Sequence, residues 1–544
     1  MSSAAERQAR PGRPLPPLPA EWRSLGHALV ASARENWSRP GIADSSDLEL
    51  TFGETLIRSL ALGRVLARTL GPEQHVGLLL PPMVPTTVTN LALALWGRVA
   101  INLNYTASAE LLDSAVEQAG IRQVLTSRVV LERLGLRPKA ELVLLEDLRP
   151  RVTTADKLWA AAMARAAPVR LLERVLPGLR PGRLDAPAVV MFTSGSTGEP
   201  KGVVLTHRNI LSNAHQVGHQ LEFAPDDVVL GILPFFHCFG YTVTLWMTAC
   251  LGVKTALHSS PLDAQTVGEL CHKHRVTILL AAPTFMRGYL ERNEPSQFAS
   301  VRKLVLGSEK LKPTLAQAIR DRLGIEPLEG YGCSELSPAV AVNVPELVFA
   351  DGVRRPANRP GSVGIPLAGT LISTCDPDSG EPLPAGSPGL IWVKGPQVMA
   401  GYLGRPDLTA EVVRDGWYCT GDLGHQDEDG FLHIGDRLSR FSKIGGEMVA
   451  HAAVESALMA ATGADELALA VTAVPDERRG ERLVVIHTAL DPKAAVRALG
   501  GSGIAKLWIP GADDFVQVEA LPMLGNGKLD LKALRRLALA RTGG

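Results

Sequence analysis

The sequence predicts an α/β protein built from several domains, and three features of the chain lead to this prediction. The chain has 544 residues, which allows several domains at about 100 to 200 residues each. Between about residues 50 and 330, short apolar runs such as 75–80, 188–193 and 276–281 alternate with longer amphipathic stretches such as 52–69. Strands separated by helices are typical of α/β units with largely parallel sheets.

The third feature is a change of pattern after about residue 360. Turn sequences such as Pro384-Ala385-Gly386 and Asp429-Gly430 become dense, and the segments between them are short and strand-like. This pattern indicates a mainly β subdomain over about 360–436, and a smaller α+β unit follows it. The expected divisions are a disordered lead-in over 1–22, an N-terminal domain over 23–436 and a C-terminal domain over 437–544.

Composition and charge narrow the classes of function. Hydrophobic residues make up 46% and charged residues 21% of the chain, as in soluble globular proteins. Lys+Arg and Asp+Glu each number 56, and this zero net charge argues against a nucleic acid partner, because phosphate binding needs a surplus of basic residues. The 6 cysteines form no Cys-x-x-Cys pair, and the sequence has no signal peptide and no apolar stretch of about 18 residues. We therefore expect a cytoplasmic protein with reduced cysteines.

One segment, residues 157–176, is Ala-rich and apolar and carries Arg165, Arg170 and Arg174. Two interpretations of it stay open. The segment can form two ordinary surface helices that are broken at Pro168, because proline interrupts a helix interior. It can instead meet a membrane surface or acyl chains, as a basic amphipathic segment does. In that case the protein is peripheral to the inner face of the membrane.

The strongest chemical signal is the sequence MFTSGSTGEPKG at residues 191–202. An apolar strand at 188–192 leads into a loop of Gly, Ser and Thr that ends at Lys201. Such a loop suits phosphate, because glycines let the backbone approach, N–H and hydroxyl groups surround the oxygens, and lysine adds positive charge. The Gly-Lys-Ser/Thr order of a Walker A loop is absent. The residues that we expect at the phosphates are Thr193, Ser194, Gly195, Ser196, Thr197, Gly198 and Lys201.

This segment resembles the phosphate loop of the adenylate-forming superfamily, which includes acyl-CoA synthetases, adenylation domains of nonribosomal peptide synthetases and luciferases. Further motifs resemble that superfamily in the same order: GYGCSE at 330–335, WYCTGD at 417–422, GDRLSRFSKIGGE at 435–447 and LGNGKLD at 524–530. The resemblance extends from about residue 25 to the last residue. It implies a large N-terminal domain of two α/β subdomains plus a small β-barrel-like subdomain, followed by a small mobile α+β C-terminal domain.

The resemblance also implies roles at a bound nucleotide. Glu335 would bind Mg²⁺, which prefers hard oxygen ligands, and Tyr331 would stack on adenine. Asp422 would accept hydrogen bonds from both ribose hydroxyls, and Arg437 would also contact the ribose. The remaining residues that the resemblance assigns to the nucleotide are Gly307, Ser308 and Glu309 in the adenine pocket, Gly332 in the adenine motif, and Ser334 near the phosphates.

Three further positions concern the reacting groups. The resemblance implies that Lys528 bridges the carboxylate and the α-phosphate, where positive charge stabilises the transition state. His237 is either a core histidine or, as the resemblance implies, a gate at the mouth of the acyl pocket. Ser439 stands at the hinge position where the superfamily often has Asp or Lys. The residues that would line the tunnel of the acceptor thiol are Lys443, Gly445 and Gly446.

Other segments resemble one branch of the superfamily, the acyl-ACP synthetase half of the bifunctional 2-acylglycerophosphoethanolamine acyltransferase/acyl-ACP synthetase. They are NYTA at 104–107, TTADKLW at 153–159, KGPQVMAGYL at 394–403 and KIGGEMV at 443–449. The resemblance implies an enzyme that uses ATP and Mg²⁺ to convert a long-chain fatty acid to acyl-AMP, and then loads the phosphopantetheine thiol of acyl carrier protein. The basic residues of 528–541 suit an acidic carrier protein or belong to a solvated helix. Two alternatives stay open: a CoA ligase for a medium- or long-chain fatty acid or an aryl acid, and a catalytically silent binding protein on this fold.

Overall fold

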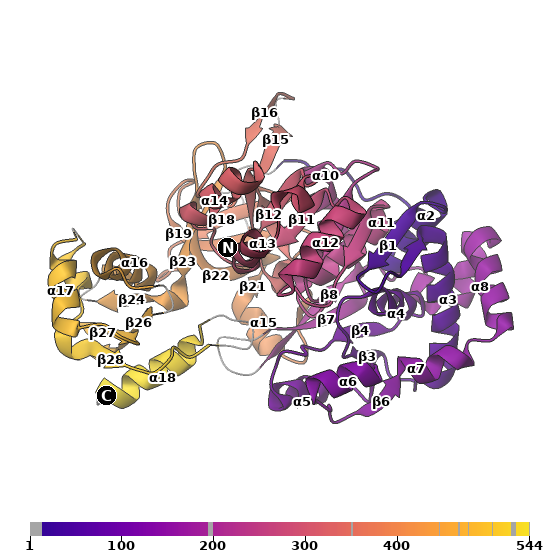
Figure 1. Cartoon of the computed structure of the whole chain (residues 1–544), viewed down its shortest axis with the longest axis horizontal. Helices are drawn as coiled ribbons and strands as arrows, with labels where there is room; N and C mark the ends of the chain where they lie inside the picture. Colours follow the sequence, from indigo (N-terminus) through magenta and orange to yellow (C-terminus); the bar gives the residue numbers. More distant parts are fainter. Residues whose placement is uncertain are drawn as a thin grey trace.

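The computed structural model describes residues 13–193, 200–349, 352–444, 447–465, 468–476, 478–502, 504–523 and 529–542. Figure 1 shows a large body of sheets and helices and, at one end, a smaller body formed by the C-terminal part of the chain. The secondary structure confirms the expected α/β class with a β-rich segment before the C-terminal part.

The first sheet of the large body has nine strands in the order β17-β14-β13-β12-β11-β9-β10-β1-β2. The neighbours from β13 to β1 are parallel, whereas β14, β17 and β2 join antiparallel at the two edges. In this order the strands are Ile365–Pro366, Ala339–Val342, Pro327–Gly332, Lys303–Leu306, Ile278–Ala281, Val228–Gly231, Lys254–Leu257, Pro40–Asp44 and Glu49–Thr51. The central strands β9 and β11 are buried along their whole length, which explains their continuous apolar sequences.

The second sheet has seven strands in the order β20-β8-β7-β4-β3-β5-β6. The strands are Gly401–Tyr402, Lys201–Thr206, Pro187–Thr193, Val99–Asn102, His75–Leu78, Gln123–Thr126 and Glu141–Leu144. The pairs from β7 to β6 are parallel, and β7, β8 and β20 pair antiparallel. The antiparallel hairpin β7–β8 therefore lies next to one edge of the sheet, and the short strand β20 covers that edge.

Helices lie around both sheets (Figure 1). Local sequence explains where several of them begin: Thr51 and Glu54 form a capping box at the start of α3, and Thr206 and Asn209 form one at the start of α10. The longer helices of the large body are α2 (Leu25–Glu35), α3 (Phe52–Thr69), α4 (Val84–Leu95), α5 (Ala109–Gln118), α8 (Thr154–Ala166), α10 (His207–Leu221), α12 (Ala264–His274), α13 (Pro283–Arg292) and α14 (Pro313–Leu323). A buried π-helix, η3 (Phe239–Met247), packs against α10 and continues into α11 (Thr248–Leu251).

The β-rich segment forms an antiparallel sheet of five strands. They are β18 (Leu371–Cys375), β19 (Gly389–Lys394), β21 (Val413–Arg414), β22 (Trp417–Gln426) and β23 (Leu432–Arg437). Trp417 and Trp392 are buried with Cys375 in a small apolar cluster of their own. The short helix α15 (Pro406–Val412) leads into β21.

The C-terminal part has its own five-stranded sheet and its own cores. The strands are β24 (Phe441–Ile444), β25 (Glu447–Ala450), β26 (Leu469–Asp476), β27 (Gly480–His487) and β28 (Phe515–Gln517), and the helices are α16 (His451–Thr462), α17 (Pro492–Gly500) and α18 (Leu531–Thr542). Val454 and Leu458 of α16 belong to one apolar cluster, and Leu534 and Ala538 of α18 belong to another. This α+β arrangement agrees with the expected fold class.

The segment 13–22 differs from the disordered lead-in expected over 1–22. The N–H of Gly369 donates to the carbonyl of Arg13 at 2.7 Å, and a Cβ built on Gly369 would lie 2.9 Å from Cβ of Leu15. Trp22 is 6% exposed and belongs to the main core. Composition alone missed these contacts, because a few apolar side chains among the prolines are enough to fix the segment. Residues 1–12 lie outside the described part of the chain.

Across the described ranges, no helix is both long enough and apolar enough to cross a bilayer.

Buried His451 makes the stability of the C-terminal part depend on pH. Its Nε2 and the Ser442 hydroxyl share a hydrogen bond of 2.6 Å, and burial, with the charges of Arg440 and Arg535, lowers its pKa to about 4. Its ordinary pKa is about 6.5. Above about pH 6.5 the ring is neutral in both the folded and the unfolded chain, and the full stability is present. As the pH falls from there toward 4, protonation of the ring favours the unfolded chain, and this stability is lost.

We expect the free energy of unfolding at pH 4.5 to lose about 2 to 3 kcal/mol through this group, relative to pH 7. Denaturant unfolding, followed by a probe in the C-terminal part, measures it. The His451→Gln variant should show a correspondingly weaker pH dependence. An identical pH dependence of the variant and the original protein would contradict the assignment.

Candidate active site

The ends of the expected phosphate loop are fixed by the hairpin β7–β8. Thr193, the last residue of β7, pairs with Lys201, the first residue of β8, and the Thr193 hydroxyl donates to the Lys201 carbonyl at 3.4 Å. Val189 and Val190 of β7 are completely buried, which anchors the hairpin in the sheet. The expected phosphate ligands that lie outside the described residues are Ser194, Gly195, Ser196, Thr197 and Gly198.

Lys201 lies in a row with Tyr402 and Glu335. The Lys201 Nζ is 5.1 Å from the centre of the Tyr402 ring, and the Tyr402 hydroxyl donates to Glu335 Oε1 at 2.9 Å. Burial, with the negative charge of Glu335, raises the pKa of Tyr402, so the hydroxyl keeps its proton and donates. The sequence analysis did not single out Tyr402. The segment 394–403, which contains Tyr402, was noted only for its resemblance to one branch of the superfamily.

Glu335 is also held through its backbone. It lies in the single turn η5 (Ser334–Leu336), and its carbonyl accepts a hydrogen bond of 2.8 Å from the Met399 N–H. Gly332, just before this turn, must be glycine, because a Cβ there would lie 2.0 Å from the Pro338 carbonyl oxygen. The close approach of these backbones brings Ser334 and Glu335 to the end of β13.

Asp422 joins the adenine and ribose motifs. The Tyr331 hydroxyl of β13 donates to Asp422 Oδ2, and Arg437 Nε lies 3.2 Å from Asp422 Oδ1. Asp422 and Arg437 face each other in the register of β22 and β23. The Asp422 side chain is 8% exposed and that of Arg437 63%. The structure thus brings together the two residues expected at the ribose, and it adds the Tyr331 hydroxyl to them, while stacking of the Tyr331 ring on adenine stays a prediction.

The residues expected to line the adenine pocket follow β12. A Cβ on Gly307 would lie 3.4 Å from the Gly330 carbonyl oxygen, so this loop runs beside the end of β13. Ser308 has a left-handed backbone with φ of 72°. Glu309 Oε2 accepts a hydrogen bond of 2.6 Å from the Thr284 hydroxyl. These contacts place the loop next to the adenine motif.

His237 is exposed, and this exposure does not fit a core histidine. The residue directly precedes the buried segment that leads into η3. Its ring centre lies 4.5 Å from that of Phe236, which in turn lies 4.8 Å from the ring of Tyr105. The role of His237 as a gate stays a prediction.

The residues expected at the hinge and the acceptor tunnel lie at the start of the C-terminal part. Ser439 falls in the short 3₁₀ turn Leu438–Arg440, and Lys443 lies on β24. Lys443 Nζ is 2.7 Å from Asp378 Oδ2 on the β-rich segment. Gly445, Gly446 and Lys528 lie outside the described residues.

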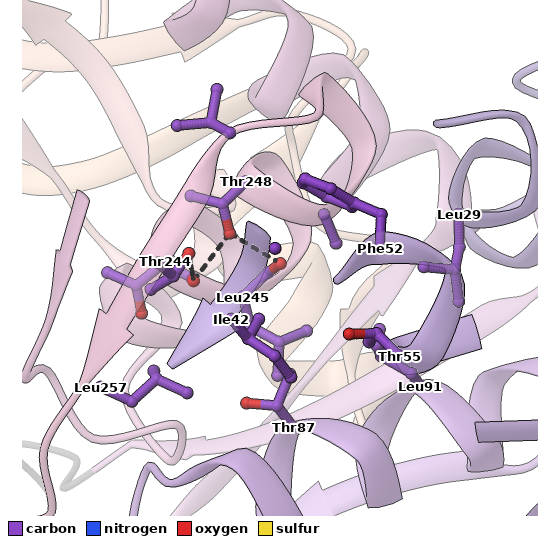
Figure 2. A pocket seen from close by; sticks show the side chains of 14 residues that line it. Leu29, Ile42, Phe52, Thr55, Thr87, Leu91, Thr244, Leu245, Thr248 and Leu257 are labelled. Carbon is purple, nitrogen blue, oxygen red and sulfur yellow. Dashed lines mark hydrogen bonds between the residues drawn. The ribbon is translucent and has the colours of Figure 1, made fainter. Parts of the chain in front are cut away.

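A cavity in the main core is separate from these residues (Figure 2). Figure 2 shows Thr244, Leu245 and Thr248 on one side of it and Phe52, Leu29 and Thr87 among the other lining residues. None of the site residues expected from the sequence lines it. Its volume of about 10 Å³ is close to the smallest that can hold one water molecule. This cavity therefore cannot hold an organic acid in the conformation described.

Comparisons with known proteins agree with the motifs. The family model described as AMP-binding enzyme matches residues 30–403. A feruloyl-CoA synthase from Amycolatopsis sp is 35% identical over 365 residues, which are 65% of this chain and 71% of that protein. A long-chain-fatty-acid–CoA ligase from Yersinia pestis is 28% identical over 501 residues, 86% of each chain. The structure of o-succinylbenzoate CoA synthetase from Bacillus subtilis with its acyl-adenylate intermediate superimposes with a TM-score of 0.76 at 25% identity, and covers 93% of this chain and 97% of that one.

Asp422 gives a direct test of the site. We expect Asp422→Asn to weaken AMP binding about tenfold or more, because a carboxylate makes stronger hydrogen bonds than an amide. Isothermal titration with AMP measures this loss. Asp427→Asn is the matched control, because Asp427 follows the same strand and also pairs with an arginine, Arg359. Equal losses in both variants, or none in Asp422→Asn, would contradict the site.

Proposed function

Because the chain belongs to the AMP-binding enzyme family, we propose that it activates a long-chain fatty acid as the acyl-adenylate and transfers the acyl group to the thiol of CoA. At the coarser level it is an AMP-forming acid–thiol ligase that uses ATP and Mg²⁺. The relatives named long-chain-fatty-acid–CoA ligase support a fatty acid, and the feruloyl-CoA synthase keeps an aryl acid as the alternative substrate. The observation that carries the proposal is the row of Lys201, Tyr402 and Glu335 beside the phosphate-loop hairpin.

The residues present fit a magnesium ion. Glu335 supplies carboxylate oxygens, which Mg²⁺ prefers, and Tyr402 and Met399 fix the side chain and backbone of this residue. A bound ion would neutralise charge on the phosphate oxygens. Lys201 and the hydroxyls of the phosphate loop would hold the same phosphates from the hairpin.

The nucleoside would lie across Tyr331, Asp422 and Arg437. A carboxylate has room for about four hydrogen bonds, so Asp422 can accept from the ribose hydroxyls in addition to its present donors. His237 would guide the fatty acid carboxylate, and Lys528 would stabilise the charge that builds between carboxylate and α-phosphate. These groups hold the reactants in line, which is the main contribution that a protein makes to this chemistry.

We propose that residues 437–544 act as a lid over the domain 23–436. A lid keeps the acyl-adenylate away from water between the two half-reactions. Lys443 now pairs with Asp378, but these side chains are 51% and 72% exposed, and exposed ion pairs contribute little to stability. A turn about Ser439 that carries the loop of Lys443, Gly445 and Gly446 toward the thiol would therefore break only a weak contact here.

Acyl carrier protein is the second candidate acceptor, and the basic surface of α18 is compatible with it. Exposed basic residues on this helix are Lys532, Arg535, Arg536 and Arg541. Arg535 approaches one acid, with its Nη2 3.8 Å from Glu481 Oε1. A basic surface suits the acidic surface of a carrier protein and equally the phosphates of CoA.

Mass spectrometry of the products separates the two acceptors. Palmitate, ATP and Mg²⁺ are supplied with CoA in one tube and with holo-acyl carrier protein in another. We expect palmitoyl-CoA with little acylated carrier protein. Acylation of the carrier protein in preference to CoA would replace the proposed acceptor, and failure to form pyrophosphate in either tube would overturn the activation step.

We propose further that α8 and α9 (Val169–Val175) contact an anionic membrane surface. The structure has the two helices on either side of Pro168, and four apolar side chains on them are exposed: Leu158 by 68%, Leu171 by 43%, Val175 by 42% and Val169 by 39%. Exposed Arg165, Arg170 and Arg174 lie among them. Apolar and basic side chains exposed on the same two helices favour the interface of acidic lipids.

Sedimentation with vesicles tests this contact. We expect the protein to bind vesicles of phosphatidylglycerol more tightly than vesicles of phosphatidylcholine. Replacement of Leu158 by Ser together with Arg170→Glu should remove most of this binding. Leu262→Ser is the control, because Leu262 is 70% exposed in the turn before α12, away from α8 and α9 in sequence. Unchanged binding of the double variant would show that α8 and α9 are ordinary surface helices.

A further inference from the structure

One face of α10 carries four buried amides where a core helix normally has apolar residues. Asn209, Asn213, Gln216 and Gln220 are spaced by four, three and four residues, so they share one face. Their exposed fractions are 7%, 0%, 0% and 1%. Burying an amide is unfavourable unless its polar atoms are hydrogen-bonded. The partners of these amides therefore indicate what the face is for.

Asn213 forms two hydrogen bonds to the backbone of β14, opposite the adenine motif. Its Nδ2 donates to the Ala339 carbonyl at 2.8 Å, and its Oδ1 accepts from the Ala339 N–H at 3.1 Å. Ala339 lies on β14 and pairs with Gly332 of β13. The Asn213 amide thus binds both backbone polar groups of Ala339. Ala339 pairs with Gly332, which lies just before the turn that holds Glu335.

Asn209 forms hydrogen bonds to the segment 396–398, which lies on the other side of Glu335. Its Nδ2 donates to the carbonyls of Pro396 at 2.9 Å and Val398 at 2.8 Å. The carbonyl between them, that of Gln397, accepts from the Ser337 hydroxyl at 2.8 Å. The next residue, Met399, donates to the Glu335 carbonyl, and this segment continues to Tyr402.

Gln216 connects Asn213 to the segment 396–398. Its Nε2 donates to the Ala368 carbonyl at 2.8 Å and lies 3.3 Å from Gln397 Oε1, while Asn213 Nδ2 lies 3.3 Å from Gln216 Oε1. The network therefore connects β14, the segment 396–398 and α10 without a charged group. Gln220 differs, because it binds Arg13 and the Val342 carbonyl at the other end of β14, and it contacts neither Ala339 nor the segment 396–398.

We propose that Asn209 and Asn213 are positioning residues for the magnesium site, an inference that rests on the proposed role of Glu335. They hold the backbone segments on either side of Glu335 to one rigid helix, so that the position of the Glu335 carboxylate is fixed before an ion binds. Mg²⁺ demands near-ideal geometry, and a displacement too small to unfold the protein is enough to weaken its binding.

The Mg²⁺ dependence of ATP binding, measured by isothermal titration without a fatty acid, and the Mg²⁺ dependence of palmitate-dependent pyrophosphate release test the proposal. We expect Asn213→Ala to raise the half-saturating Mg²⁺ concentration about tenfold, which is the loss typical of removing a group that supports a metal ligand. Gln220→Ala is the matched control, an equally buried amide on the same face, and should change this concentration less than about twofold even where thermal stability falls. Equal shifts in both variants, or an unchanged Mg²⁺ dependence in Asn213→Ala, would overturn the proposal.

Two further variants keep the result interpretable. Ser337→Ala removes a single hydrogen bond to the segment 396–398, and it should shift the Mg²⁺ dependence in the same direction even if Asn213→Ala does not fold. Glu335→Gln tests the underlying function separately. If Glu335→Gln leaves the Mg²⁺ dependence unchanged, the proposed role of Glu335 is wrong. If only Asn213→Ala and Ser337→Ala leave it unchanged, the positioning proposal alone is wrong.

Discussion

The hydrogen bond from the Tyr402 hydroxyl to the Glu335 carboxylate connects the parts of the chain that make up the site. Lys201, Glu335 and Tyr402 come from three segments that are distant in sequence. They meet because β20 pairs with β8, which places Tyr402 beside the phosphate-loop hairpin, and because Met399 binds the backbone of Glu335. A buried phenol that keeps its proton can hold a carboxylate without adding a second negative charge. The contact thus brings together the residues proposed to bind phosphate and magnesium.

Much of the fold and the motif positions could be predicted, because both depend on local patterns. Continuous apolar runs indicated the buried parallel strands, and the motif at 417–422 led to Asp422, which the register of β22 and β23 places opposite Arg437. The role of Tyr402 could not be found in this way, because its contact depends on how two sheets meet. The amide face of α10 was also missed. Sequence patterns assign polar residues to the solvent side of a helix, and only the tertiary structure shows that these amides face backbone groups.

The contacts inside the large body differ in kind from the contact between the large body and the C-terminal part. Inside the large body, buried amides and strand register fix the site with many uncharged hydrogen bonds. Between the β-rich segment and β24, the exposed Lys443–Asp378 pair is a contact that water can replace. The proposed lid movement needs both properties, because the nucleotide ligands of the large body must stay in place while the residues of the C-terminal part change position.

The two-residue strand β20 has a consequence for solubility as well. An exposed sheet edge can pair with another chain, and natural proteins protect such edges with short strands. Gly401 and Tyr402 cover the edge of the seven-stranded sheet at Val204 and Val203. The same two residues thus complete the site and shield the sheet from self-association. Loss of this short segment would therefore expose one sheet edge and remove the Tyr402 contact to Glu335 at the same time.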